Sequence, residues 1–141
     1  MEKVQCIVYR INGGNVEILL LKTIPGRGGF WQSVTGKVEP GESLCDAARR
    51  ELHEETGIDT HGNGCREIFS FSFSKNRNEY HEHVFVFKVN TEQAIDLSGN
   101  VYPEHVGYKW FEAEDALRLL RFKEEKEALE QALLEISKQQ C

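Results

Sequence analysis

Three glutamates, Glu51, Glu54 and Glu55, lie within five consecutive residues of the stretch GKVEPGESLCDAARRELHEETGI, residues 36–58. On a helix, side chains three or four residues apart have their Cβ atoms about 5–6 Å from each other. At an effective dielectric constant of 20, two carboxylates at that separation repel each other by about 3 kcal/mol. A hard divalent cation reverses this repulsion, because Mg²⁺ and Mn²⁺ prefer oxygen ligands. The spacing therefore indicates a metal site, with a solvated acidic helix end as the alternative.

The residues that flank these glutamates predict the helix that positions them. Ser43 is a suitable N-cap residue, and Gly57 is a suitable left-handed residue at the C-terminal end. At 100° per residue, Glu51 and Glu55 share a stripe with the small apolar residues of the first half of the helix, and Glu54 lies at its edge. Negative charge at a helix C-terminus also opposes the helix dipole. Both features count against a solvated helix face, but the spacing by itself leaves the metal site and the solvated helix end both open.

A longer pattern surrounds the glutamates. It consists of a glycine, five residues, a glutamate, seven residues, Arg-Glu-Leu, one residue, Glu-Glu, one residue and Gly-Ile, and it runs from Gly36 to Ile58. This pattern resembles the signature box of the Nudix hydrolases, and every fixed position of the box is filled. Members of that family cleave a nucleoside diphosphate that is linked to another group. The resemblance implies a protein of the α/β class, with a Nudix-type α/β/α sandwich and a mixed β-sheet.

The resemblance also implies a role for the charged residues of the box. Glu51, Glu54 and Glu55 are the expected ligands for Mg²⁺, with Mn²⁺ as an alternative metal. The backbone carbonyl of Gly36 is expected to contribute a further oxygen ligand. Arg50, four residues before Glu54, is expected to hold a glutamate in place for catalysis.

The expected chemistry is the hydrolysis of a phosphoanhydride. The negative charge of the phosphates repels an attacking hydroxide, and metal ions bound by the glutamates neutralise that charge and lower the pKa of a bound water. A further carboxylate must act as general base within hydrogen-bond reach of that water. Glu54 in the box and Glu104 in a later loop are the two candidates. The alternative for Glu104 is an exposed loop glutamate without a catalytic role. Glu42, in contrast, is expected to stabilise the loop that precedes the helix.

Two runs outside the central box indicate the substrate class. FWQSVTGKVEPGES, residues 30–43, and EHVGYKWFEAEDALRLL, residues 104–120, resemble the bacterial dihydroneopterin triphosphate pyrophosphatases. That resemblance implies the release of pyrophosphate from a pterin triphosphate, with Glu104 as an added metal ligand or as the base. The runs KVEPGES and AEDALRLL also resemble dinucleoside polyphosphate hydrolases of the diadenosine tetraphosphate type. A housecleaning pyrophosphatase that acts on oxidised or noncognate nucleoside triphosphates is the third alternative.

A pterin or nucleobase needs an aromatic or apolar wall and a few hydrogen-bonding groups. Phe30, Trp31 and Gln32 are candidates for binding the ring, although a tryptophan beside a strand also fits a core position. Lys22 and Arg27 are candidates for binding the phosphates, with plain solvated charges as the alternative. Residues 63–80 are expected to shape the substrate pocket.

The hydrophobic pattern predicts the elements that carry these residues. Aliphatic and aromatic alternation predicts strands, and apolar residues at helical spacing predict two helices near the end of the chain. The predicted strands are 4–11, 16–22, 30–35, 68–73, 83–89 and 108–111, and the predicted later helices are 113–120 and 124–138. No repeat or linker divides the chain, so residues 1–141 are expected to form a single Nudix hydrolase domain.

The composition indicates which classes of binding partner and which cellular compartment to expect. Seventeen basic and 23 acidic residues make a formal charge of −6, which argues against nucleic-acid binding. No apolar run approaches the length of a membrane span and no secretory signal is seen, so we expect a cytoplasmic protein with a small-molecule partner. Its four cysteines form no C-x-x-C pair and are expected to be reduced. The sequence leaves monomer and homodimer open.

Two further alternatives concern single features. His81 and His83 would lie on one face of a strand, as zinc ligands can, but without a third convincing ligand we expect a surface or packing role. A Nudix-fold ligand-binding module without catalysis is the non-enzyme alternative. Such modules usually lack a box glutamate or the arginine, and this chain has all of them, which favours an enzyme.

Overall fold

The computed structural model describes residues 1–60, 65–100 and 104–139. Within these residues, seven strands form one sheet, and three α-helices and two short 3₁₀ helices accompany it. The strands are β1 (Glu2–Asn12), β2 (Asn15–Thr23), β3 (Trp31–Gln32), β4 (Val34–Lys37), β5 (Glu67–Lys75), β6 (Asn78–Lys88) and β7 (His105–Glu112). The helices are α1 (Leu44–Thr56), α2 (Ala113–Leu119) and α3 (Lys123–Gln139), with the 3₁₀ helices η1 (Pro25–Arg27) and η2 (Leu97–Gly99).

The sheet is mixed, as predicted. Its main path runs β3-β2-β1-β6-β5, with β4 also paired to β1 and β7 paired to β2. β1 and β6 are parallel, and the other strand pairs of the described residues are antiparallel. Gly13 and Gly14 turn the chain between β1 and β2 with positive φ angles of 58° and 86°, which suit a hairpin with right-twisted strands. The parallel pairing of β1 with β6 requires the long connection that contains α1.

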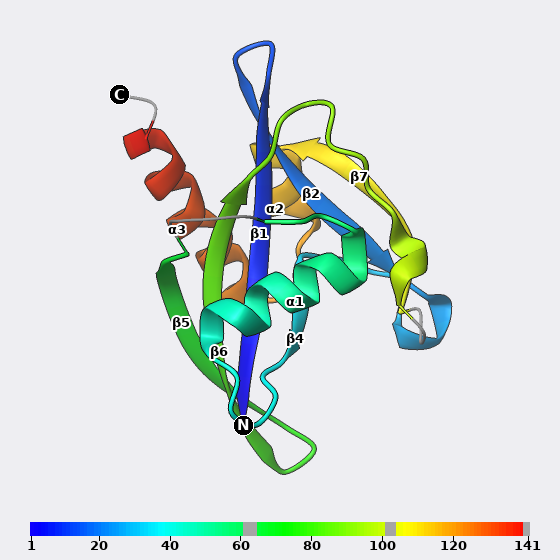
Figure 1. The fold of residues 1–141 in the computed structure, drawn as a ribbon, viewed down its shortest axis with the longest axis vertical. Coiled ribbons are helices and arrows are strands. Elements are labelled where there is room, and N and C mark those ends of the chain that lie inside the picture. Colours follow the sequence, from blue (N-terminus) through cyan, green and yellow to red (C-terminus); the bar gives the residue numbers. More distant parts are fainter. Residues whose placement is uncertain (61–64, 101–103, 140–141) are drawn as a thin grey trace.

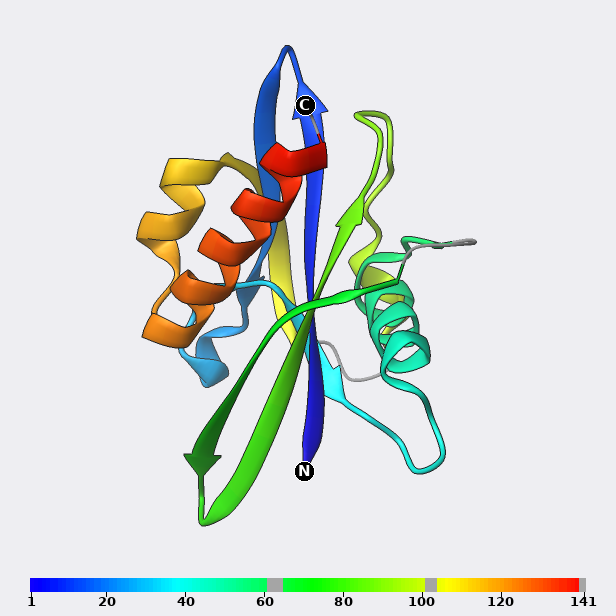
Figure 2. The same cartoon turned by 90° about the vertical axis from the view of Figure 1, so that its left-hand side faces the viewer.

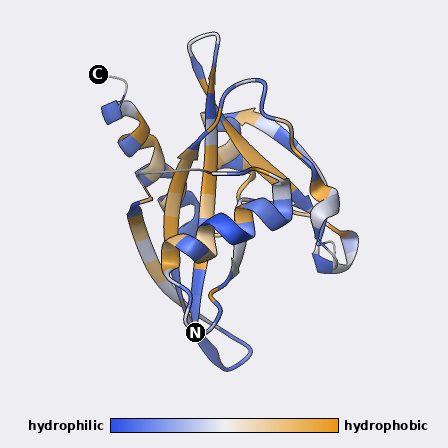
Figure 3. Cartoon of the chain, in the orientation of Figure 1, coloured by the Kyte–Doolittle hydropathy of each residue, from blue (hydrophilic) through white to orange (hydrophobic). Residues whose placement is uncertain are grey.

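The helices cover both faces of the sheet (Figures 1 and 2). Alternate residues of β1 point to opposite faces, so Val4 and Val8 pack in the core under α1, whereas Ile7 packs in the core under α2 and α3. Figure 3 shows the hydrophobic residues concentrated along the central strands. The α/β/α sandwich is therefore confirmed. No helix in the described part of the chain is long and apolar enough to cross a bilayer.

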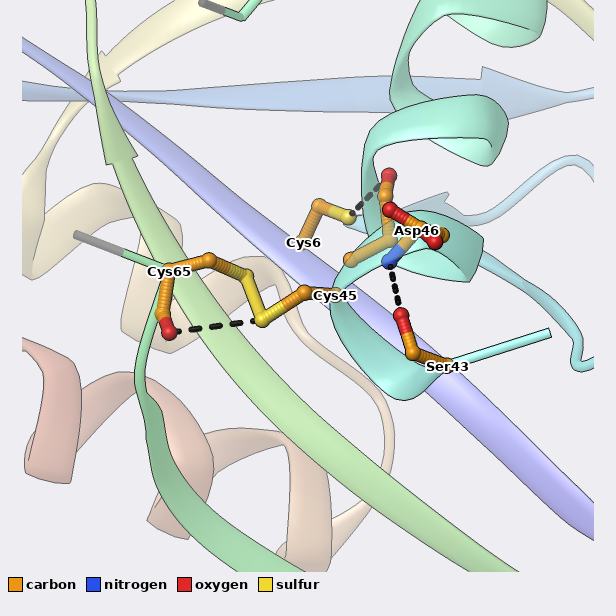
Figure 4. The surroundings of a disulfide bond; sticks show 6 residues. Cys6, Ser43, Cys45, Asp46 and Cys65 are labelled. Carbon is orange, nitrogen blue, oxygen red and sulfur yellow. Dashed lines mark hydrogen bonds between the residues drawn. A yellow bond between two sulfur atoms is a disulfide. The ribbon is translucent and has the colours of Figure 1, made fainter. Parts of the chain in front are cut away.

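The prediction of reduced cysteines is wrong for one pair. Cys45, in the first turn of α1, and Cys65, just before β5, form a disulfide with their Cα atoms 5.9 Å apart (Figure 4). The two residues are separated by 20 positions in the sequence, so only the packing of α1 brings them within disulfide range. Cys6 is a free, buried thiol that donates to the carbonyl oxygen of Ala48 at 3.2 Å. Cys141 lies outside the described residues.

Candidate active site

Helix α1 begins and ends as its capping residues predict. The Ser43 hydroxyl accepts a hydrogen bond from the Asp46 backbone N–H at 3.1 Å, which satisfies one free donor of the first turn. Gly57 has a φ of 76°, and its N–H donates to the carbonyl of His53 at 2.8 Å. The helix therefore carries the predicted glutamates in its second half, and Glu51 is the one that faces β4.

Arg50 connects the box residues. Its Nε and Nη2 donate to the two carboxylate oxygens of Glu42 at 2.7 and 2.9 Å, a bidentate pair that lowers the pKa of Glu42. Its Nη1 donates to Glu51 at 2.8 Å and to Glu54 at 3.3 Å. Nη2 also donates to the backbone carbonyl of Lys37 at 2.9 Å. One guanidinium therefore contacts two box glutamates and ties the preceding loop to α1.

Gly36 is the residue of β4 that lies against the Glu51 side chain of α1. A Cβ atom added to Gly36 would overlap the carboxyl group of Glu51, so any larger residue at this position would displace that carboxylate. The Glu51 side chain is 12% exposed, and its burial raises its pKa, although Arg50 opposes that shift. Carboxylate oxygens, a closely packed glycine backbone and a single organising arginine suit a hard divalent cation such as Mg²⁺. The residues present therefore fit a divalent metal ion.

Glu55 has different surroundings from Glu51. It is buried, and Asn100 Nδ2 donates to its Oε1 at 2.7 Å. Its Oε2 lies 3.1 Å from His105 Nδ1, and His105 Nε2 lies 2.8 Å from the amide nitrogen of Gln32. Asn100 and His105 were not predicted from the sequence, since nothing in their local pattern places them beside α1. Glu54, in contrast, has a side chain that is 46% exposed.

Glu104 pairs with Arg27 across the loop after β2. The two side chains form an ion pair at 2.5 Å and are each 44% exposed. The carbonyl oxygen of Glu104 accepts from the Ile24 N–H at 2.9 Å, which anchors the backbone as well. Because the next residue, His105, contacts Glu55, the Glu104 backbone lies close to the second half of α1.

A cavity of about 630 Å³ lies on the face of β4 opposite to Glu51. Its wall combines aromatic rings with basic and polar side chains, which suits a flat ring that carries phosphates. The aromatic residues are Phe30, Phe71, Phe73, Tyr80 and Phe122, the basic residues are Lys3, Arg27, Lys37 and Lys75, and the acidic residues are Glu82, Glu124 and Glu125. Gln32, Thr35, Ser74 and Asn76 complete the lining. Many of these residues belong to the predicted pocket segment 63–80, of which residues 63 and 64 lie outside the described chain.

The five predicted substrate-binding residues lie in two places. Arg27, Phe30 and Gln32 line the cavity. Trp31 instead packs edge-on against Phe111, with 5.0 Å between ring centroids, beside the core under α2 and α3. Lys22 does not line the cavity, and its Nζ lies 5.7 Å from the centroid of the Trp31 ring.

Strand β4 separates the cavity from the box glutamates. Thr35 and Lys37 line the cavity, whereas Gly36 between them faces Glu51. β4 pairs with β1 along one edge and with no other strand of the described residues. Gln32 connects the two faces, because it lines the cavity and contacts His105, which contacts Glu55.

Comparisons with known proteins agree with this geometry. The model of the NUDIX domain matches residues 1–133. An octanoyltransferase from Myxococcus xanthus is 32% identical over 94% of this chain, but the chain spans only 36% of that protein. A dihydroneopterin triphosphate diphosphatase from Escherichia coli K12 is 35% identical over 74% of this chain and 75% of its own length. The crystal structure of a binary complex of a C. elegans Ap4A hydrolase superposes with a TM-score of 0.82 at 26% identity, covering 96% of this chain and 97% of that one. The chain therefore belongs to the Nudix family.

Proposed function

We propose that the protein is a Mg²⁺-dependent Nudix pyrophosphohydrolase, with Mn²⁺ as an alternative metal. The observation that carries this proposal is the carboxylate cluster of α1, which Arg50 organises against Gly36 beside an aromatic and basic cavity. The proposed metal ligands are Glu51, Glu54, Glu55, Glu104 and the carbonyl of Gly36. When bound, a divalent metal neutralises phosphate charge and lowers the pKa of a coordinated water.

The side chains of the site have separate proposed roles. Arg50 holds Glu51 and Glu54 in position, while Asn100 and His105 hold Glu55. Glu54 is the proposed general base, since its carboxylate is the most exposed of the three. It would accept a proton from the attacking water as the water oxygen bonds to phosphorus and the anhydride P–O bond breaks. Glu104 is the alternative base, and the leaving phosphates depart with the electron pair of that bond.

The substrate that we favour is dihydroneopterin triphosphate, which would be cleaved with release of pyrophosphate. Five aromatic residues and several cations line a cavity large enough for a bicyclic ring with part of its phosphate chain. The name and 35% identity of the E. coli diphosphatase support this choice. Gln32 at the cavity edge would position the substrate where its phosphates pass round β4 toward α1.

A dinucleoside polyphosphate such as diadenosine tetraphosphate is the second candidate. The similarity to the C. elegans Ap4A hydrolase, at 26% identity, favours it. The same cavity would then hold one nucleobase, since an adenine ring needs the same aromatic wall.

The test is product identification with purified protein and Mg²⁺. The panel contains dihydroneopterin triphosphate, diadenosine tetraphosphate, and common and oxidised nucleoside triphosphates. We expect pyrophosphate to be released from the pterin at the highest kcat/KM, with no turnover in EDTA. ATP formed preferentially from the dinucleotide would assign the second candidate, and pyrophosphate released preferentially from an oxidised nucleotide would assign a housecleaning role.

A control distinguishes the enzyme from a ligand-binding module. Glu54→Gln keeps the shape of the side chain but removes a ligand and the proposed base, so turnover should fall by at least about 100-fold. The variant should keep its thermal unfolding midpoint. Unchanged turnover in Glu54→Gln would contradict the role of Glu54, and binding of substrate without turnover in the wild type would favour the module.

A further inference from the structure

A second group of metal-ligating side chains lies outside the candidate active site. His81 and His83 are two residues apart on β6, so their side chains share one face of the sheet, with 4.3 Å between ring centroids. Glu2 of the neighbouring parallel strand β1 lies opposite His81 in register. One ligand atom from each of the three residues lies within 4.8 Å of the others. The pairing of β1 with β6 thus supplies the third ligand that the sequence alone did not reveal.

The distances in this group are close to those of a tetrahedral zinc site. Oε2 of Glu2 lies 3.1 Å from Nε2 of His83 and 3.7 Å from Nδ1 of His81. Ligand atoms around a tetrahedral Zn²⁺, each about 2.0–2.1 Å from the metal, lie about 3.4 Å from one another. Small side-chain adjustments would therefore bring all three atoms to coordination distance. A two-histidine, one-carboxylate set also suits Zn²⁺ better than Mg²⁺, which prefers oxygen ligands.

Glu67 completes the arrangement from the opposite side of His83. Its Oε1 contacts Nδ1 of His83, while Nε2 of the same ring faces Glu2. A carboxylate that accepts the Nδ1–H of a histidine leaves the Nε2 lone pair free for a metal, and such carboxylates orient zinc-binding histidines in many proteins. The His83 side chain is only 10% exposed, so this orientation is held by packing as well.

We propose that Glu2, His81 and His83 form a second metal site that binds Zn²⁺, oriented by Glu67 and completed by water. The Glu2 and His81 side chains are 51% and 44% exposed, so an ion can enter from solvent. The site shares no ligand with the candidate active site. In the register of the sheet, Val4 of β1 lies between His83 and Gly36, which places the two sites on either side of β1. Bound Zn²⁺ would fasten the first residues of β1 to β6.

The test measures Zn²⁺ binding by isothermal titration calorimetry in excess Mg²⁺, with the thermal unfolding midpoint as a second readout. Wild-type protein should bind one more equivalent of Zn²⁺ than His81→Ala, and Zn²⁺ should raise the unfolding midpoint of the wild type only. His81 is well exposed, so its removal should leave the fold intact. Glu2→Gln should lose the same equivalent.

Matched variants separate this site from nonspecific binding. Glu67→Gln should weaken Zn²⁺ binding by about 10–100-fold without removing the site, because it only orients His83. Glu79→Gln, an exposed glutamate of the same hairpin, and His53→Ala, an exposed histidine of α1, should bind Zn²⁺ like the wild type. Equal Zn²⁺ stoichiometry and affinity in the wild type and His81→Ala would overturn the proposal.

Discussion

Glu51, Glu54 and Glu55 are identical side chains with three different surroundings. Burial against Gly36 raises the pKa of Glu51, and Arg50 holds its carboxylate. Glu54 is half exposed, whereas Glu55 is buried between Asn100 and His105. Exposure to solvent is needed by a group that exchanges a proton with water, and a fixed position is needed by a metal ligand. The surroundings therefore support Glu54 as the proposed base in addition to its role as a proposed ligand, and Glu51 and Glu55 as positioned ligands.

Gly36→Ala tests whether the position of Glu51 matters for catalysis. The new methyl group would displace the Glu51 carboxylate, and a shift of about 1 Å in a catalytic group can cost about 100-fold in rate. We expect kcat/KM to fall by that order. Gly107→Ala is the matched control, because a Cβ there meets nothing within 4 Å. A Gly36→Ala enzyme with the wild-type rate would show that Glu51 is not held at a catalytic position.

The raised pKa of Glu125 leads us to expect that the stability of the fold depends on pH. Burial, and then the charge of Glu82, raise its pKa from an ordinary 4.5 to about 7, although Arg121 opposes the shift. Between these two values the folded state keeps a proton that the unfolded state has released, so the free energy of unfolding falls as the pH rises. Glu125→Gln cannot ionise, and it should be more stable than the wild type above pH 7 by up to about 3 kcal/mol.

Urea unfolding at pH 5 and pH 8 measures this effect. The gain from Glu125→Gln should be large at pH 8 and much smaller at pH 5. Glu130→Gln, an exposed position on the same helix, should follow the wild type at both values. The same gain at both pH values would mean that ionisation of Glu125 is not the cause.

At the scale of elements, α1 is fastened at both ends and in the middle. The Cys45–Cys65 disulfide holds its first turn to the segment before β5, and Arg50 joins its centre to the Lys37 carbonyl. At its C-terminal end, the carbonyl oxygen of Thr56 accepts from the Asp96 N–H at 2.8 Å. These contacts hold the glutamates in place before substrate binds, which lowers the cost of assembling the site.

Reduction of the disulfide should destabilise the protein. Closing a loop across the 20-residue separation lowers the entropy of the unfolded chain, and the corresponding stabilisation is about 3 kcal/mol. We expect dithiothreitol to lower the thermal unfolding midpoint of the wild type. The double variant Cys45→Ala, Cys65→Ala should unfold at the lower midpoint with or without dithiothreitol. If the wild-type unfolding midpoint were the same with and without dithiothreitol, that result would contradict a stabilising role for this disulfide.

At the scale of the whole molecule, the cavity exists only because separate layers meet. Lys3, Lys37, Phe73 and Tyr80 come from four strands, and the first turn of α3 closes the wall with Glu124 and Glu125. The Lys37 ammonium lies 6.0 Å from the centroid of the Tyr80 ring, so a cation stands beside an aromatic wall. This arrangement offers a phosphate partner next to a ring partner, as a nucleotide or pterin triphosphate requires.

Lys37→Ala tests that arrangement. A charge-assisted hydrogen bond to phosphate contributes about 1.5–3 kcal/mol, so KM for the triphosphate should rise by about 10–100-fold. We expect kcat to change less, because Lys37 would bind the substrate in the ground state as well as in the transition state. Lys109→Ala, an exposed lysine of β7, should keep the wild-type KM. An unchanged KM in Lys37→Ala would place the phosphates elsewhere.

Local pattern predicted the elements well. Each predicted helix is present, but the predicted strand 30–35 is divided into β3, which pairs with β2, and β4, which pairs with β1. β6 begins at Asn78, before the predicted start at residue 83. The polar run NEYHEH has little hydrophobic alternation, and its extended structure comes from pairing with β5 on one side and β1 on the other. The Nudix family and the α/β/α fold are confirmed. The metal ligands and the single domain of residues 1–141 stay predictions.

The sequence by itself determined α1 and what it carries, because caps, helical periodicity and contacts between residues three or four apart are local properties of the chain. The position of Arg50 beside Glu54, four residues later, follows from that spacing. Tertiary structure alone decided the contacts between distant segments: the Cys45–Cys65 bridge, His105 beside Glu55, the cavity, and Glu2 beside His81 and His83. Those contacts depend on strand pairing and on the packing of helices against the sheet. Both bring together residues that are far apart in the sequence, and the local sequence around each residue does not predict which distant residue it will contact.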